Sequence, residues 1–177
     1  MSLRETQPVL VADIGGTHAR FALAQPGNSK PETPTILMTA LYPTLREALQ
    51  TFLQQVDNPE LGGVAMCAAG PVQSTGAAAR IEMRNCPWVV DAQAVAKATG
   101  CAAPVLVNDF TAAAVSLPHL HAEDLLQIGQ GAAKPAAPIG VLGPGTGLGV
   151  SGLVPQTDGT YTALSGEGGH VSLAPGN

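Results

Sequence analysis

The chain has 177 residues, room for one domain or for one domain and the start of another, and a globule of this size buries about 70% of its unfolded surface. Its formal net charge is −5 and only 3% of its residues are aromatic, which argues against binding of nucleic acid. Three widely spaced cysteines without a C-x-x-C pair, no signal-peptide core and no run of about 18 apolar residues favour a cytoplasmic protein with reduced thiols and no membrane span.

The first half of the chain predicts strands and two capped helices. Val9–Ile14 is nearly continuous in apolar residues, which is typical of a strand buried on both faces. The connections to the next two strands are too short for helices, so the first three strands should be antiparallel neighbours. Thr44 and Glu47 form a capping box before an apolar stripe at helical spacing. Asp91 caps a second helix, which Gly100 ends. The strands expected here are Val9–Ile14, Phe21–Ala24, Thr35–Leu41, Gly63–Ala69 and Ala77–Met83.

The second half predicts a strand–helix unit and then a new set of strands. The strand Pro104–Val107 delivers Asn108 and Asp109 to its carboxyl end. A helix over Phe110–Leu117 follows, and residues 121–138 predict an irregular connection that we interpret as the hinge into a second lobe. The order βββαβαβα, followed by new strands, predicts an α/β fold with a mixed sheet and helices on its faces. The later strands are expected at Ile139–Gly143, Gly147–Val154 and His170–Ala174.

The sequence DIGGTHAR predicts an anion-binding loop. Gly15 and Gly16 allow the backbone to turn with positive φ and let an anion approach the amides, and Thr17 adds a hydroxyl. A buried Asp13 would be costly without a partner, so a metal ion or its water shell is a natural one. The alternative is a hairpin turn whose aspartate caps its own loop.

The sequence GPGTGLGV predicts a second loop of this kind. Its four glycines leave only backbone and the hydroxyl of Thr146 to contact a ligand. The loop lacks the lysine of a P-loop, and a strand rather than a helix follows it, which excludes a dinucleotide-binding turn. A glycine-rich hairpin is the alternative. Together the two loops suggest two backbone cradles for one polyphosphate.

The sequence LVNDFTAA places polar groups at the carboxyl end of a predicted strand. Asp109 can accept a proton from a hydroxyl there, and Asn108 supplies a donor and an acceptor for sugar hydroxyls. The alternative role of Asp109 is a helix N-cap.

In RNCPW, Asn85 and Trp88 either line a ligand loop or, for the tryptophan, fill the core.

The sequence SGEGGH places two polar side chains on either side of two glycines. Glu167 and His170 can both face one small polar ligand, and a carboxylate with an imidazole suits the recognition of neighbouring hydroxyls. No further cysteine or histidine lies nearby to complete a zinc site. A solvated turn is the alternative.

The four motifs VLVADIGGTHARFALA, LVNDFTAA, GPGTGLGV and SGEGGH, in this order and spacing, resemble the bacterial glucokinase family of the hexokinase, actin and heat-shock-ATPase superfamily. The resemblance runs through essentially all 177 residues but covers only about the first half of a family member. It implies a ribonuclease-H-like mixed sheet and two lobes that close over a cleft. Residues 1–119 would form a small α/β domain, and residues 120–177 would begin a large α/β domain whose remainder this chain lacks.

The resemblance implies ATP-dependent phosphorylation of glucose at its 6-hydroxyl, which gives glucose 6-phosphate and ADP. Asp13 would hold Mg²⁺ indirectly, through water, and Asp109 would be the general base on the 6-hydroxyl. The residues expected on the phosphates are Gly15, Gly16, Thr17, Gly145, Thr146 and Gly147, and those expected on the sugar are Asn108, Asp109, Glu167 and His170.

Family members carry an adenosine-binding loop and a further sugar-binding glutamate in their second half, so we expect this chain alone to be inactive. A symmetric homodimer is a further implication of the resemblance. The main alternative is a sugar-sensing regulator of the same superfamily without kinase activity, and an actin-type ATPase would not need the sugar residues. Asp109 discriminates between enzyme and sensor, because a sensor has no need of a base beside the 6-hydroxyl.

Overall fold

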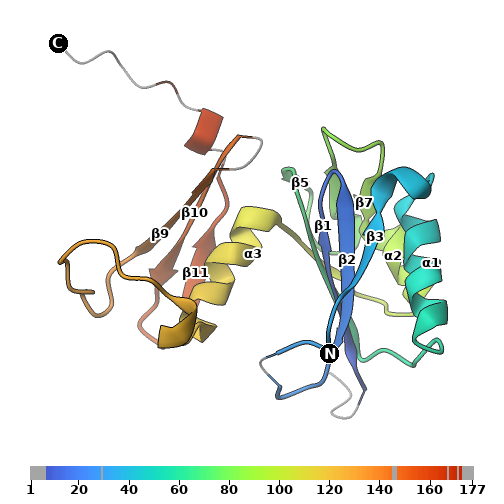
Figure 1. Ribbon diagram of the computed structural model, residues 1–177, viewed down its shortest axis with the longest axis horizontal. Coiled ribbons are helices and arrows are strands. Elements are labelled where there is room, and N and C mark those ends of the chain that lie inside the picture. The colour runs from blue at the N-terminus through green and yellow to red at the C-terminus, as the bar shows by residue number, and fades with distance from the viewer. Residues whose placement is uncertain (1–6, 29, 145–146, 167, 171, 173–177) are drawn as a thin grey trace. The chain divides into compact units, whose positions relative to one another are not determined.

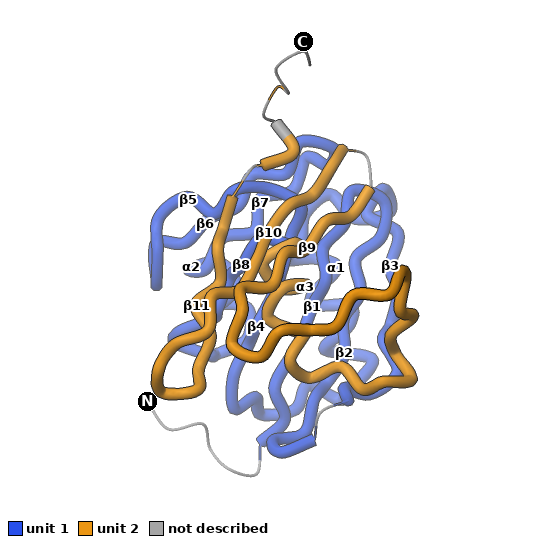
Figure 2. Tube along the Cα trace, turned by 90° about the vertical axis from the view of Figure 1, so that its left-hand side faces the viewer, with its two compact units in different colours: residues 1–109 blue, residues 110–177 orange. Residues whose placement is uncertain are grey.

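The computed structural model describes residues 7–28, 30–144, 147–166, 168–170 and 172 (Figure 1). The chain forms two compact units, residues 1–109 and residues 110–177, which are coloured separately in Figure 2. The sequence placed the boundary after residue 119, so the two divisions differ over helix α3 (Asp109–Ser116) and the turn that follows it. Which division matches the functional domains stays a prediction.

The first unit is built on a mixed five-stranded sheet in the order β3-β2-β1-β4-β8. The strands β1, β2 and β3 are antiparallel neighbours, as predicted, and β4 and β8 run parallel to β1. This is the mixed sheet that the sequence predicted. The strands are β1 (Val9–Ile14), β2 (His18–Ala24), β3 (Thr35–Met38), β4 (Gly63–Ala68) and β8 (Val105–Asn108).

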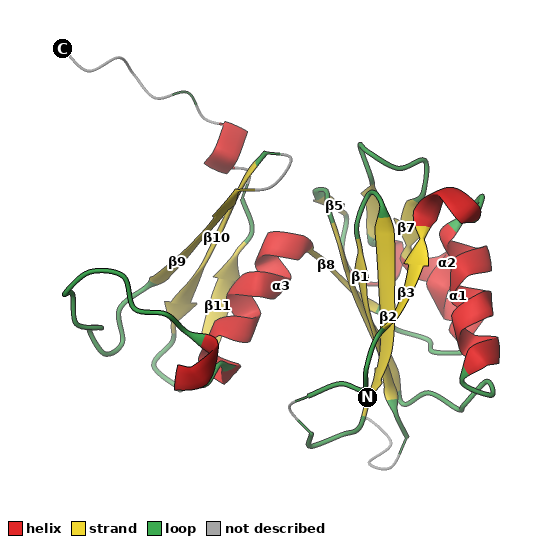
Figure 3. Ribbon diagram, in the orientation of Figure 1, coloured by secondary structure: helices red, strands yellow, loops and turns green. Residues whose placement is uncertain are grey.

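Two helices, α1 (Leu45–Gln55) and α2 (Ala92–Thr99), cover one face of this sheet (Figure 3). The capping box predicted for α1 is present, with Glu47 N donating to Thr44 Oγ1 at 3.4 Å and Thr44 N donating to Glu47 Oε2 at 3.1 Å. Helix α2 is capped by Asp91 and ends at Gly100, whose φ of 74° requires glycine. Both helices therefore begin where their sequences predict, and α2 also ends at the predicted glycine.

Strand β1 is buried on one face only, which corrects the prediction of burial on both. Leu10 and Ile14 are fully buried in the core with Leu49 and Phe52 of α1, whereas the alternate residues, Asp13 among them, remain partly exposed. The side chains of a strand alternate between its faces, so the polar end of β1 faces away from the helix layer.

A small antiparallel sheet joins β4 to α2, in the order β5-β6-β7. The sequence predicted one strand at Ala77–Met83, where the structure has a 3₁₀ turn and then β6 (Arg80–Glu82). The flanking strands β5 (Val72–Gln73) and β7 (Val89–Asp91) were missed.

Trp88 is 2% exposed and its Nε1 donates to Tyr42 O at 2.9 Å, so it belongs to the core.

The second unit contains α3 and an antiparallel sheet in the order β11-β10-β9. Strands β9 (Ile139–Pro144) and β10 (Leu148–Pro155) were predicted, and β11 (Tyr161–Leu164) was missed. Residues 121–138 hold one 3₁₀ turn and are otherwise irregular, as predicted. The strand predicted to begin at His170 is wrong there, because this residue ends a 3₁₀ turn, and residues 171 and 173–177 lie outside the described chain.

None of the helices in the described ranges is both long and apolar enough to cross a membrane.

Candidate active site

The β1–β2 loop presents two backbone amides that are not used within the described chain. Gly15 N donates to His18 O at 2.9 Å, and Thr39 anchors the loop by donating through Oγ1 to Gly16 O at 2.8 Å and through N to Thr17 O at 3.0 Å. The N–H groups of Gly16 and Thr17 make no hydrogen bond to another described residue. The loop is therefore held through its carbonyl groups, and its amides are left to bind an anion.

The two glycines of this loop are required for space and not for positive φ, which corrects the prediction. Neither φ lies in the left-handed region. A Cβ on Gly15 would lie 3.1 Å from His18 O, and one on Gly16 would lie 3.1 Å from Asn85 Cβ and 3.3 Å from Asn85 O. The turn that carries Asn85 thus packs directly on the loop, as a residue lining the ligand site would.

Asp13, at the end of β1, is half-exposed and has protein partners, which corrects the expectation that it is buried, while its role toward a metal stays a prediction. Its Oδ2 accepts from Arg20 Nη1 at 3.0 Å, and its side chain is 48% exposed. Its Oδ1 accepts from Cys67 Sγ at 3.7 Å. Arg20 of β2 and Cys67 of β4 are the residues paired with Asp13 across the two neighbouring strands, so sheet register sets this arrangement.

Cys67 lies between the two acidic residues of the candidate site. Burial, followed by the charges of Asp13 and Asp109, raises the pKa of its thiol from 9.0 to about 12. The thiol therefore stays protonated at neutral pH, and a coulombic effect from both carboxylates means that both lie near this sulfur. Cys67, Cys86 and Cys101 are all free, as the sequence predicted.

Asn108 ends β8 and orients Asp109. Its Nδ2 donates to Gly70 O at 3.1 Å and to Asp109 Oδ1 at 2.9 Å, which uses both amide hydrogens. Asp109 is the first residue of α3, so the position before the helix, where a capping side chain sits, belongs to Asn108. The carboxylate of Asp109 is thus fixed at the carboxyl end of a parallel strand, where α/β proteins bind their ligands.

In the second unit, the ring of Phe110 lies on the β9–β10 hairpin. Gly143 and Gly149 face each other across the two strands. A Cβ on Gly143 would lie 2.6 Å from Phe110 Cζ, and one on Gly149 would overlap the same ring. Two of the four glycines in GPGTGLGV therefore make room for Phe110, a role that the sequence reading missed.

The SGEGGH segment packs on the same hairpin. A Cβ on Gly168 would lie 3.0 Å from Val150 Cγ1, and one on Gly169 would overlap Leu148 O. The hydroxyls of Thr111 and Ser165 lie 3.3 Å apart, which ties the start of α3 to this segment. Within this unit, the residues that follow Asn108–Asp109 in the chain contact both the glycine hairpin and the segment predicted to bind sugar.

Several predicted site residues lie outside the described chain. These are Gly145, Thr146 and Glu167, together with the side chain of His170. Gly147, also predicted on the phosphates, lies in an exposed bend between β9 and β10. The roles predicted for all of them stay predictions.

The described residues fit a Mg²⁺–phosphate complex better than a metal centre made of protein ligands. No group of three or more His, Cys, Asp or Glu that could hold a metal occurs within the described ranges. Mg²⁺ commonly keeps several waters and binds through one or two carboxylates plus substrate phosphates. One half-exposed carboxylate, Asp13, beside the unused amides of Gly16 and Thr17 matches that pattern.

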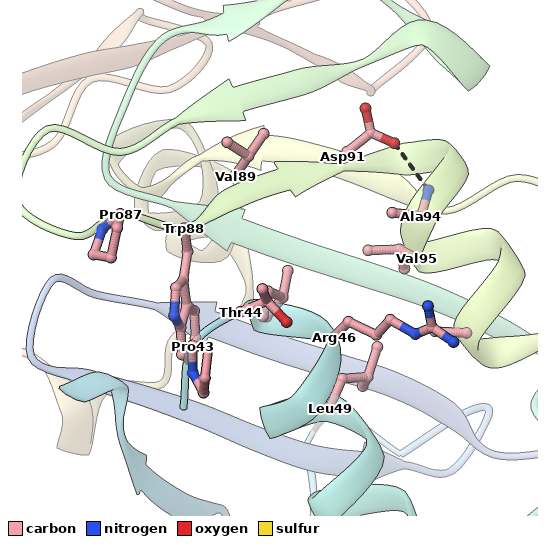
Figure 4. A pocket seen from close by; sticks show the side chains of 12 residues that line it. Pro43, Thr44, Arg46, Leu49, Pro87, Trp88, Val89, Asp91, Ala94 and Val95 are labelled. Carbon is pink, nitrogen blue, oxygen red and sulfur yellow. Dashed lines mark hydrogen bonds between the residues drawn. The ribbon is translucent and has the colours of Figure 1, made fainter. Parts of the chain in front are cut away.

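A separate cavity of about 300 Å³ opens between α1, α2 and β7 (Figure 4). Pro43, Leu49, Trp88 and Val95 make it largely apolar. The carboxylate of Asp91 at its edge accepts from Ala94 N at 2.8 Å and is used to cap α2. None of the residues predicted on the phosphates or on the sugar lines this cavity.

The chain matches the family model described as Glucokinase over residues 10–177. It is 44% identical to the glucokinase of Chromobacterium violaceum over 99% of its length, which covers 49% of that relative. It is 45% identical to the glucokinase of Paramagnetospirillum magneticum over 96% of its length, which covers 51% of that protein. The chain thus spans about half the length of the curated relatives it matches.

Solved structures share the fold. A glucokinase from an Antarctic psychrotroph is 31% identical with a TM-score of 0.82, and the match covers 97% of this chain and 53% of that one. A ROK family transcriptional regulator shares the fold with a TM-score of 0.65 at 17% identity, over 95% of this chain and 42% of the regulator. With the match to the family model and the identity to curated relatives, these findings show that the chain belongs to the glucokinase family.

Proposed function

We propose that this chain supplies the first half of an enzyme that transfers the γ-phosphoryl group of ATP to the 6-hydroxyl of glucose. Two relatives more than 40% identical over nearly the whole chain are named glucokinase. A glucokinase from Balamuthia mandrillaris, 19% identical, is solved in complex with glucose and shares the fold with a TM-score of 0.74. By complete enzyme we mean a polypeptide that contains this chain followed by the half that its relatives carry beyond the match.

One observation carries the enzymatic role most directly, namely the fixed carboxylate of Asp109. Asn108 Nδ2 donates to its Oδ1 at 2.9 Å, which fixes the direction of the carboxylate proposed to take a proton. A general base must be held within hydrogen-bond reach of the proton it removes, and a carboxylate anchored through one oxygen meets that requirement.

In the proposed reaction, the carboxylate of Asp109 accepts the proton of the glucose 6-hydroxyl. The oxygen O6 then forms a bond to the γ-phosphorus while the bond from that phosphorus to the bridging oxygen of ADP breaks. The products are glucose 6-phosphate, ADP and one proton, which Asp109 returns to solvent. Such transfers need mainly positioning and neutralisation of the phosphoryl charge.

The β1–β2 loop would hold the phosphates through the amides of Gly16 and Thr17, and Asp13 would hold a water of the Mg²⁺ ion. When bound, Mg²⁺ neutralises charge on the phosphate oxygens. Gly145, Thr146 and Gly147 would contact the phosphates as well. Asn108, Glu167 and His170 would bind the remaining sugar hydroxyls.

The alternative of a sugar sensor is supported by one solved neighbour, the ROK family transcriptional regulator. The enzyme is favoured because a sensor has no need of an anchored base or of an amide-lined phosphate loop.

A coupled assay of the complete enzyme tests the proposal, with MgATP and with glucose, mannose, fructose or N-acetylglucosamine as acceptor. We expect ADP release that depends on sugar and is fastest with glucose. Glucose binding by calorimetry without any ADP release would favour the sensor. Release with another hexose only would retain the kinase but refute the substrate.

A further inference from the structure

Cys67 occupies the position in the sheet between the two acidic residues of the candidate site. On one side it pairs in register with Asp13 of β1. On the other side it pairs with Val107 of β8, two residues before Asp109. Residues paired across neighbouring strands point to the same face, so the Cys67 and Asp13 side chains lie on one face of the sheet.

The carboxylate of Asp13 is held through both of its oxygens. Arg20 Nη1 donates to Oδ2 at 3.0 Å, and Cys67 Sγ donates to Oδ1 at 3.7 Å. The arginine is 47% exposed, so it can swing and is screened by water, whereas Cys67 comes from the central part of the sheet and is largely buried. The thiol is therefore the more rigid of the two contacts.

We propose that Cys67 is a positioning residue, whose S–H group holds one oxygen of Asp13 and so fixes the direction in which this carboxylate faces the water shell of the metal. The inference rests on the proposed function, because it assumes that Asp13 serves a metal–nucleotide complex. Cys67 touches neither substrate nor metal in this role.

The chemistry of the position suits a small neutral donor. A cationic side chain there would pair with Asp13 or Asp109 and compete with the metal, and an anionic one would repel both carboxylates. An alanine would fit the space but would leave Oδ1 without this donor.

Cys101 provides a matched control within the same chain. It is also partly buried, and its Sγ donates to Leu61 O at 3.4 Å, at the end of the sheet where β4 begins. Replacing it removes a comparable S–H hydrogen bond away from Asp13. A difference between variants at the two cysteines is therefore specific to the contact with the carboxylate.

The test uses the complete enzyme with Cys67→Ala, Cys67→Ser and Cys101→Ala. Calorimetry measures the affinity for ADP with and without Mg²⁺, and a kinase assay measures the Mg²⁺ concentration for half-maximal rate. Loss of one hydrogen bond from a weak S–H donor predicts that Cys67→Ala weakens the Mg²⁺-dependent part of ADP binding about two- to tenfold. We expect Cys67→Ser, which keeps a donor, to restore it and Cys101→Ala to change nothing. Equal Mg²⁺ requirements in Cys67→Ala and Cys101→Ala would overturn the proposal.

A vibrational measurement separates this inference from the proposed function. The Raman S–H band of Cys67, isolated by subtraction of the Cys67→Ala spectrum, lies at lower frequency while the thiol donates a hydrogen bond. We expect the band to move to higher frequency in Asp13→Ala, and an unchanged band would refute the contact. If the complete enzyme shows no kinase activity but the band moves, the proposed function fails and the contact between Cys67 and Asp13 stands.

Discussion

The contact of Phe110 with two glycines of the β9–β10 hairpin gives a sharp stability prediction. Gly149→Ala would place a Cβ on the ring atoms Cδ2, Cε2 and Cζ, so the ring must move. Overpacking of this kind costs about 1–3 kcal/mol. Against this, alanine loses less backbone entropy than glycine when a strand folds, which is worth about 0.5–1 kcal/mol. The expected net loss is about 1–2 kcal/mol in the free energy of unfolding.

A double-mutant cycle with Phe110→Ala, followed by urea unfolding of the complete enzyme, isolates the contact. In the Phe110→Ala background, Gly149→Ala should cost nothing or stabilise slightly, because the overlapping ring is gone. Gly140→Ala is the matched control, since Gly140 lies in β9 of the same hairpin with nothing within 4 Å of its added Cβ. An equal cost of Gly149→Ala with and without the ring would refute the assignment of these glycines to Phe110.

Three further outcomes follow from other contacts. Gly16→Ala should raise the KM for MgATP by about tenfold or more while leaving the affinity for glucose nearly unchanged. The added Cβ would lie 3.1 Å from Asn85 Cβ, so the loop and its amides at positions 16 and 17 would shift. An unchanged KM would contradict the phosphate-binding role of the loop. Trp88→Phe should lower the free energy of unfolding, measured by chemical denaturation, by about 2–3 kcal/mol, because it creates a cavity and leaves Tyr42 O without its donor. A loss below about 0.5 kcal/mol would contradict this prediction. Because the pKa of Cys67 is raised in the folded protein, its thiol ionises between pH 9.0 and about 12 in the unfolded chain but not in the folded one. The free energy of unfolding should therefore fall with rising pH across this window, by at most about 1.4 kcal/mol per pH unit, and less steeply in Cys67→Ala. Equal slopes in the two proteins would refute the raised pKa.

Much of the fold was predictable because its signals are local. The capping box at Thr44, the N-cap at Asp91 and the glycine stop at Gly100 each act within one turn of helix and appear in the structure as predicted. The strands that were missed depend on partners elsewhere in the chain. Strand β7 is three residues long and is defined by its pairing with β6. The first three residues of β2, two of them polar, are defined by their pairing with β1 and β3.

The roles predicted for the site residues stay predictions, and most of the contacts among these residues could not be predicted from the sequence. The ion pair between Asp13 and Arg20 could have been inferred, because a tight turn between β1 and β2 places these residues opposite each other. The roles of Cys67 and Phe110 carried no such signal. Each depends on a contact with a residue far along the chain, and single-sequence patterns do not register contacts of that kind.

The most direct test of the account is the effect of Asp109→Asn on the complete enzyme. The change keeps the size of the side chain and an oxygen for Asn108 but removes the base. We expect kcat to fall by about 10²–10⁴-fold while the Kd for glucose changes only a few-fold. The exposed substitution Asp57→Asn, at a position whose positive φ asparagine also tolerates, should leave both unchanged. A kcat for Asp109→Asn near that of the unmodified enzyme would contradict the account.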